Sequence, residues 1–138
     1  MSTVSDITRR ALRLINVLDR NESPGAEDSD TAILALNGMC RRWEANGMAM
    51  GWNDVANPSD TMPSPPEADD AIAYNLALRL APEYMQQPNP AVISFAAEGL
   101  RELRRDRAVE MPLTQTTDAP MGYGRGRYDI LTDSWLPY

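Results

Sequence analysis

The residue types that carry most enzyme chemistry are scarce in this sequence. It has no His and no Lys, all 13 of its basic residues are Arg, and its only Cys is Cys40. These absences exclude a histidine base, a lysine Schiff base, and an imidazole or multi-thiolate metal site. One thiol cannot form an internal disulfide, and it suits a reducing compartment. Cys40 falls on the apolar stripe of an expected helix, so we interpret it as a core residue and not as a nucleophile.

Carboxylates are the remaining candidates for catalysis. The 20 acidic residues allow a two-carboxylate glycosidase, in which an acid with a raised pKa faces a second acid across a cleft. Glu44 and Glu83 would be candidates among many. However, no acid stands alone in an apolar run. A solvated acidic surface is therefore the favoured interpretation, and no catalytic residue is assigned.

A second group of acids lies in a proline-rich stretch between residues 53 and 70. The stretch contains Asp54, Asp60, Asp69 and Asp70 but no Arg. The spacing of these acids does not follow the calcium-binding loop pattern, and prolines interrupt it. We therefore expect a mobile acidic loop, with no metal site and no cofactor.

Length and composition describe one folded domain. The chain has 138 residues, of which 43% are hydrophobic, which is enough for a real core. Its net charge of −7 argues against binding DNA by neutralising phosphates. No apolar run approaches the roughly 20 residues of a membrane span, and the first residues lack a secretory signal pattern. These features predict a soluble protein that is kept inside the cell.

Apolar residues at three- and four-residue steps predict four helices. The first predicted helix runs from Val4 to Leu18, with Thr3 as its cap, and the second begins after the cap Ser23-Pro24 and is stopped by Asn46-Gly47. The third begins at the capping box Ser64-Pro65-Pro66-Glu67 and ends or kinks at Ala81-Pro82, and Asn89-Pro90 opens the fourth. The stripe expected to face the core on the fourth helix is Ile93, Ala96, Leu100 and Leu103. This order predicts an all-α fold, a small four-helix bundle.

A short segment between the second and third helices has a different pattern. Met48-Ala49-Met50-Gly51-Trp52 alternates large and small side chains, which predicts a short extended segment near residues 48–52. Methionine fills gaps in cores but also suits adaptable interfaces. Two alternatives, core packing and a ring or tail interface, therefore stay open for Met48, Met50 and Trp52.

The last part of the chain, residues 113–138, has no periodic apolar stripe, yet it holds 4 of the 9 aromatic residues. Disordered tails normally lack aromatic residues, so this composition predicts a long extended arm that a partner surface buries. A Gly- and Arg-containing run at 122–128 superficially resembles an RGG nucleic-acid segment, but two Arg against three Asp in the tail favour the arm. The expected anchors are Tyr123, Arg125, Tyr128, Ile130, Leu131, Trp135, Leu136 and Tyr138.

Two segments carry a resemblance to a known family. One runs from Trp43 through Gly47 to Trp52, and the other is Asn75-Leu76-Ala77 followed by Leu80-Ala81-Pro82-Glu83-Tyr84. Together with the helix order around them, over roughly residues 5–110, they resemble the tail accessory, or packaged-DNA-stabilisation, proteins of tailed bacteriophages. Those proteins are head-to-tail adaptors, and no motif in the resemblance is catalytic.

The resemblance implies a helical bundle at residues 1–112 that assembles as a ring, typically dodecameric, beneath the portal protein. Residues 113–138 would form an arm that reaches along the portal. The ring would extend the DNA channel, help to retain packaged DNA, and provide a platform for a downstream tail component. DNA would pass nearby without specific binding. The protein would be made in the host cytoplasm and end in the virion at the head–tail junction, without membrane contact.

Three hypotheses follow for function. The leading one is a structural, non-enzymatic head-to-tail adaptor. The second is a virion-associated helical enzyme that cleaves the glycan of peptidoglycan. The third is a small regulatory helical protein that contacts nucleic acid, whose signature would be salt-dependent binding.

Overall fold

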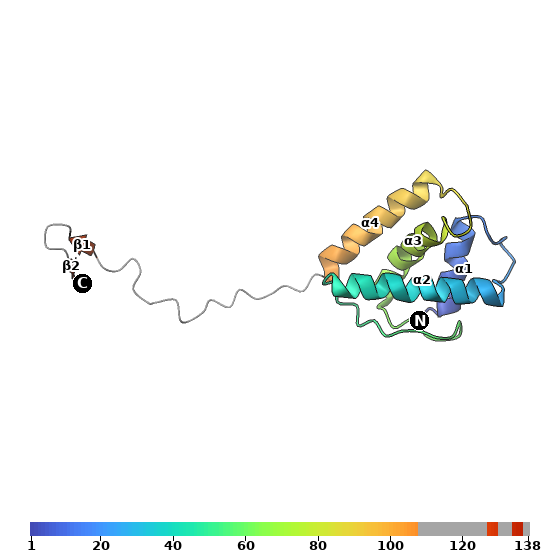
Figure 1. Cartoon of the computed structure of the whole chain (residues 1–138), viewed down its shortest axis with the longest axis horizontal. Coiled ribbons are helices and arrows are strands. Elements are labelled where there is room, and N and C mark those ends of the chain that lie inside the picture. Colours follow the sequence, from blue (N-terminus) through green and yellow to red (C-terminus); the bar gives the residue numbers. More distant parts are fainter. Residues whose placement is uncertain (108–126, 130–133, 137–138) are drawn as a thin grey trace.

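The computed structural model describes residues 1–107, 127–129 and 134–136, and side chains within residues 1–106. In chain order its elements are α1 (Val4–Leu14), α2 (Ala26–Ala45), the 3-10 helix η1 (Pro66–Ala68), α3 (Asp69–Leu80), α4 (Pro90–Arg107), β1 (Arg127–Asp129) and β2 (Ser134–Leu136) (Figure 1). The predicted all-α domain of four helices is confirmed.

The third helix is the centre of this domain. α3 packs against α1, α2 and α4, and Figure 1 shows α2 and α4 along two edges of the domain in that view. The largest side chains with almost no exposure are Leu12, Ile15, Leu36, Met39, Ile72, Leu76 and Leu80. Full burial of each such side chain contributes about 1.5–3 kcal/mol, so this cluster is a large contributor to the stability of the domain.

The start of α1 follows the sequence prediction, but its end does not. The Thr3 side chain accepts a hydrogen bond from the Asp6 N–H (3.3 Å), and the Asp6 carboxylate accepts one from the Thr3 N–H (3.0 Å), which completes a capping box. The backbone hydrogen bond from Thr3 lowers the pKa of Asp6. The helix ends at Leu14 and not at Leu18, because Asn16 adopts a left-handed conformation with φ of 59°.

Both proline-based caps predicted for α2 and α3 are wrong. Gly25 is the N-cap of α2, and the Ser29 hydroxyl donates back to its carbonyl (2.8 Å). Ahead of α3, Pro66 opens a 3-10 helix whose N-cap is Pro65. A residue that precedes proline is restricted to extended backbone, and Pro65 precedes Pro66. Pro65 therefore stays outside the helix and takes the N-cap position predicted for Ser64. The Ser64 hydroxyl is left buried without a partner among the described residues.

The start of α4 is predicted correctly, but the face it buries is shifted. The Asn89 side chain accepts a hydrogen bond from the Ala91 N–H (2.9 Å), and Pro90 takes the first helical position. Ala96 and Leu103 are buried as expected. Ile93 is 47% exposed and its place in the core is taken by Val92, so this part of the predicted stripe is wrong by one residue.

The connection between α2 and η1 is bound to the start of α1. The Val4 N–H donates to the Asp60 carbonyl (2.9 Å), and the Ser5 N–H donates to the Pro58 carbonyl (2.8 Å). These acceptors satisfy N–H groups that the first turn of a helix leaves without partners. Thr3 and Thr61 also form an isolated antiparallel bridge. The prediction of a mobile loop is therefore wrong for this segment.

Two elements in the C-terminal region were not anticipated. β1 and β2 pair antiparallel, with Tyr128 opposite Trp135 and Arg127 opposite Leu136. Neither strand was among the elements that the sequence patterns predicted, and the predicted portal-binding role of this region stays a prediction. The extended form predicted for the rest of residues 113–138 lies outside the described residues.

Candidate interaction surfaces

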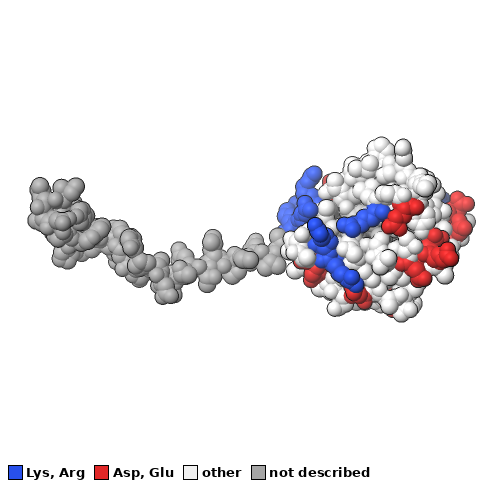
Figure 2. Space-filling view, in the orientation of Figure 1, with Lys and Arg blue, Asp and Glu red and all other residues white. Residues whose placement is uncertain are grey.

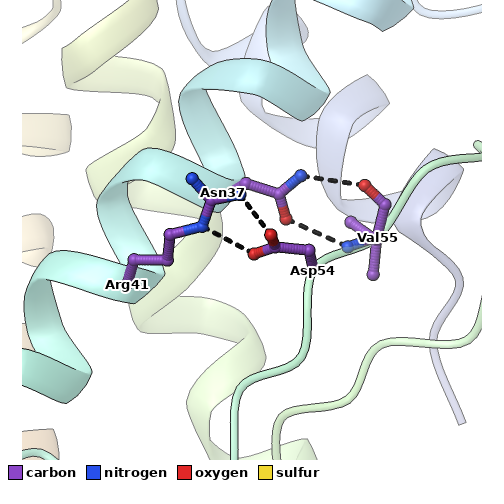
Figure 3. A network of polar contacts seen from close by, with 4 residues as sticks. All are labelled: Asn37, Arg41, Asp54 and Val55. Atoms are coloured by element: carbon purple, nitrogen blue, oxygen red, sulfur yellow. Dashed lines mark hydrogen bonds and ion pairs between the residues drawn. The ribbon is translucent and has the colours of Figure 1, made fainter.

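A polar network fixes the connection after α2 to the side of that helix. Asn37 is buried on α2, and its side-chain amide donates to the Val55 carbonyl (2.8 Å) and accepts from the Val55 N–H (3.1 Å) (Figure 3). One turn later, the Arg41 guanidinium contacts both oxygens of Asp54. The hydrogen bond from Arg41 lowers the pKa of Asp54. The network therefore holds two consecutive residues of the connection in a fixed position.

The predicted interface segment lies next to this network. Met48 and Met50 are buried in the core, at 2% and 5% exposure, and residues 48–52 are neither helix nor part of a strand. The burial favours the core alternative for the two methionines. The Trp52 side chain is partly buried, and the Trp52 backbone N–H donates to the Glu44 carboxylate (3.1 Å). An interface at this segment stays a prediction, with Trp52 as its most accessible large side chain.

The acids of the connection are used within the chain. Asp54 pairs with Arg41, and Asp60 accepts hydrogen bonds from the backbone N–H groups of residues 56 and 57. Asp69 accepts a hydrogen bond from Ser2, and Asp70 pairs with Arg10 of α1. Within the described part of the chain, no group of three or more His, Cys, Asp or Glu side chains could hold a metal ion.

An acidic groove lies between the start of α3 and the second half of α4, and sequence reasoning missed it. Its acidic side chains are Glu67, Asp70, Glu102 and Asp106. Gly99 also lines the groove and lets α4 approach α3 closely there. A Cβ at that position would lie 3.1 Å from the Cα and Cβ of Ala71. Asp70 and Asp106 are already paired with Arg10 and Arg105.

The two carboxylates named for a glycosidase are now placed. Glu44, on α2, is partly exposed and binds the Trp52 N–H. Glu83 is exposed just beyond α3. Nearby, the Tyr84 hydroxyl donates to Asp28 (2.8 Å), and burial together with this hydrogen bond raises the pKa of Tyr84.

The single thiol lies in the core. Cys40 is fully buried, and its burial raises the pKa of the thiol to about 12. Because the thiolate is the reactive form, this environment keeps Cys40 inert.

Cys40 is therefore expected to react with DTNB at pH 8 at least about a hundredfold more slowly in the folded chain than in urea. Burial excludes the reagent and suppresses ionisation, and unfolding removes both effects. The measurement is the release of thionitrobenzoate with and without urea. A chain with Ala56→Cys, exposed on the connection, provides a control that should react at once in both conditions. Equal rates for Cys40 in both states would show that this part of the core opens freely.

Apolar side chains also remain on the outside of the domain. Leu34 on α2 is 76% exposed, and Ile93 and Phe95 on α4 are 47% and 51% exposed. Phe95 contacts Tyr74 of α3, with ring centroids 5.5 Å apart. The Arg10 guanidinium lies over the same tyrosine ring, 5.4 Å from its centroid. Tyr74 of α3 is therefore contacted by α4 through Phe95 and by α1 through Arg10.

Charge is unevenly distributed over the domain. From Pro90 to Ala97, α4 has no charged residue, whereas Arg101, Arg104 and Arg105 follow in its second half. Figure 2 shows an uncharged surface where α4 begins, Arg side chains toward the end where α4 finishes, and acidic side chains toward the opposite edge. The domain therefore presents surfaces of different character to its surroundings.

The anchors predicted for the C-terminal arm are only partly placed. The backbones of Tyr128, Trp135 and Leu136 belong to β1 and β2. The backbones of the other predicted anchors, and all of the anchor side chains, lie outside the described residues. Their role stays a prediction.

One comparison with known proteins identifies the family. The family model of the P22 tail accessory factors matches residues 1–136. No curated protein matches the chain. The match defines a structural component of a phage tail, found in the virion. The chain belongs to the P22 tail accessory factor family. Among the described residues, no helix is both long enough and apolar enough to cross a membrane.

Proposed function

We propose that the protein is a non-enzymatic head-to-tail adaptor. Copies bind the portal ring, form a ring of their own, typically dodecameric, and extend the DNA channel below it. The ring helps to retain packaged DNA and provides a platform for the next tail component. The observation that carries this proposal is the match to the tail accessory factor family along residues 1–136.

The charge of the chain supports a channel role. The net charge is −7, and DNA is a dense polyanion. A ring of acidic subunits surrounds DNA without gripping it, because like charges repel. DNA therefore slides during packaging and ejection, and its retention depends on the ring as a plug or constriction and not on phosphate binding.

The composition of the C-terminal region supports its role in portal binding. Aromatic side chains dominate the energy of many interfaces, and the predicted anchors include Tyr123, Tyr128, Trp135 and Tyr138. Ordering each residue of an arm costs about 1–2 kcal/mol of backbone entropy, so the anchors have to offset this cost on docking. Many arms on one ring multiply weak individual contacts through avidity.

A truncation tests the proposal. A chain that ends at residue 112 retains every element of the helical domain, and we expect it to keep a helical circular dichroism spectrum but to lose co-sedimentation with portal rings of the same phage. Full portal binding by the truncated chain would show that the arm is not the attachment. Counting the copies of the full chain bound per portal ring tests the ring itself.

A single substitution gives a finer measurement within the full chain. Trp135→Ala should weaken portal binding about thirtyfold or more, the usual effect of removing an aromatic anchor. Thr116→Ala, in the same segment, is the matched control and should bind as the original chain does. Equal affinities for the two variants would remove Trp135 from the list of anchors.

A further inference from the structure

Two exposed stripes on α2 and α4 have matching spacing. On α2 the stripe consists of Glu27, Asp30, Leu34, Gly38 and Arg41, and all five residues are exposed. Their successive steps are three, four, four and three residues, so they lie on one face of the helix.

The stripe on α4 has the same steps. It consists of Pro90, Ile93, Ala97, Arg101 and Arg104, again all exposed. Equal steps at the same rise per residue let two such helices lie side by side with every position of one opposite a position of the other.

An antiparallel alignment of the two stripes is complementary in size. Ile93 then lies opposite Gly38, and Leu34 lies opposite Ala97. Each large apolar side chain therefore meets a small residue. Gly38 leaves room for this, because nothing lies within 4 Å of where its Cβ would be. Packing of large against small side chains is how helix surfaces interlock.

The same alignment is complementary in charge. Asp30 lies opposite Arg101, and Glu27 lies opposite Arg104. None of these four side chains has an ion pair within the described part of the chain. The parallel alignment would instead place Arg41 opposite Arg104 and an acid opposite Ile93. Charge therefore selects the antiparallel arrangement.

The two stripes cannot meet within one chain, since both helices pack their other faces on α3. We infer that α4 of one copy docks antiparallel on α2 of the next, with Leu34 against Ala97 and Asp30 against Arg101. Such a contact uses different surfaces on its two sides, so it is head-to-tail and repeats from copy to copy until a ring closes. This inference rests on the proposed function and specifies the contact between neighbouring copies.

Site-specific cross-linking on portal rings tests the contact. The chain carries Leu34→Cys and Ala97→Cys and is treated with a short bismaleimide after it has bound portal rings; buried Cys40 does not react. We expect a ladder of covalent oligomers on a denaturing gel. A mixture of the two single-cysteine chains should give dimers only, and each single-cysteine chain alone should give none.

The controls separate failure of the contact from failure of the adaptor function. Leu34→Cys combined with Ala56→Cys, an exposed alanine on the connection, should give no ladder. A ring that forms on the portal without a Leu34–Ala97 ladder overturns the contact and leaves the proposed function intact. Dimers from Leu34→Cys alone would indicate a symmetric contact and also overturn it. Absence of any binding to portal would overturn the proposed function and the contact together.

Charge exchange provides a second measurement that does not depend on cysteine geometry. Asp30→Arg alone and Arg101→Asp alone should each weaken ring assembly about fivefold per contact, and the double exchange should restore it. Two independent losses without restoration would show that Asp30 and Arg101 are not partners.

Discussion

Asn37→Ala is expected to lower the free energy of unfolding by about 2–4 kcal/mol. The substitution removes two hydrogen bonds and leaves the N–H and carbonyl of Val55 without these partners, in a residue that is only 7% exposed. Because the same pair of bonds fixes the connection on α2, the segment around Asp54 should also become sensitive to proteolysis. Urea denaturation and limited proteolysis measure the two effects.

Asn75→Ala is the matched control for this prediction. The Asn75 amide bridges the carbonyls of Ala71 and Ala96 and so links α3 to α4. Both carbonyls lie inside helices, where each already accepts a hydrogen bond from a backbone N–H. Asn75→Ala should therefore lower the free energy of unfolding by only about 1 kcal/mol. If the two variants lost equal stability, the bonds to Val55 would have no special importance and the connection would be held by its apolar contacts alone.

Gly99→Leu is expected to destabilise the domain by about 3 kcal/mol or more. Any side chain at this position meets the backbone of Ala71 on α3, since even a Cβ would lie 3.1 Å from the Ala71 Cα. The neighbour cannot move aside as a flexible side chain would, so α4 has to shift away from α3. Loss of this packing is measured by thermal and urea denaturation.

Gly38→Leu controls for the change in helix propensity. Gly38 lies inside α2, and nothing lies within 4 Å of where its Cβ would be. Leucine forms helix better than glycine, so this variant should gain about 0.5–1 kcal/mol in the isolated chain. A Gly99→Leu variant as stable as Gly38→Leu would show that α3 and α4 separate at little cost.

The features that sequence patterns predicted well are those decided by neighbours in the chain. The start of α1 after Thr3 and the Asn89-Pro90 start of α4 are confirmed, and so is the end of α2, where Gly47 has a φ of 91°. In each case the side chain or backbone preference acts within three residues. Local chemistry is enough to identify such boundaries.

One failure has a local cause: Ser64 has the composition of a cap, but Pro66 keeps the preceding Pro65 extended, so Pro65 and not Ser64 is the N-cap. The other failures arise where distant segments decide the outcome. Periodicity alone did not separate Val92 from Ile93 on α4, because the position of α3 decides which of these adjacent residues is buried. No local pattern reveals that the connection near Asp60 binds the first turn of α1.

The candidate interaction surfaces were less accessible to sequence reasoning than the fold. The alternating pattern of the segment containing Met48 and Trp52 left an interface open as one interpretation, yet its methionines are in the core. The stripes around Leu34 and Ile93 emerged only when the exposed sides of α2 and α4 were known. Exposure depends on packing over the whole domain, which is why composition identified aromatic anchors but not these helix faces.

The dependence of α1 on the Pro58 and Asp60 carbonyls has a consequence for synthesis of the protein. The first helix leaves the ribosome early, but these two acceptors for its opening N–H groups lie more than fifty residues later in the chain. At a translation rate of about 5–20 residues per second, several seconds pass between synthesis of the amino-terminal helix and synthesis of these acceptors. Translation past this point, and not synthesis of the helix itself, therefore sets when the opening N–H groups of α1 can find these acceptors.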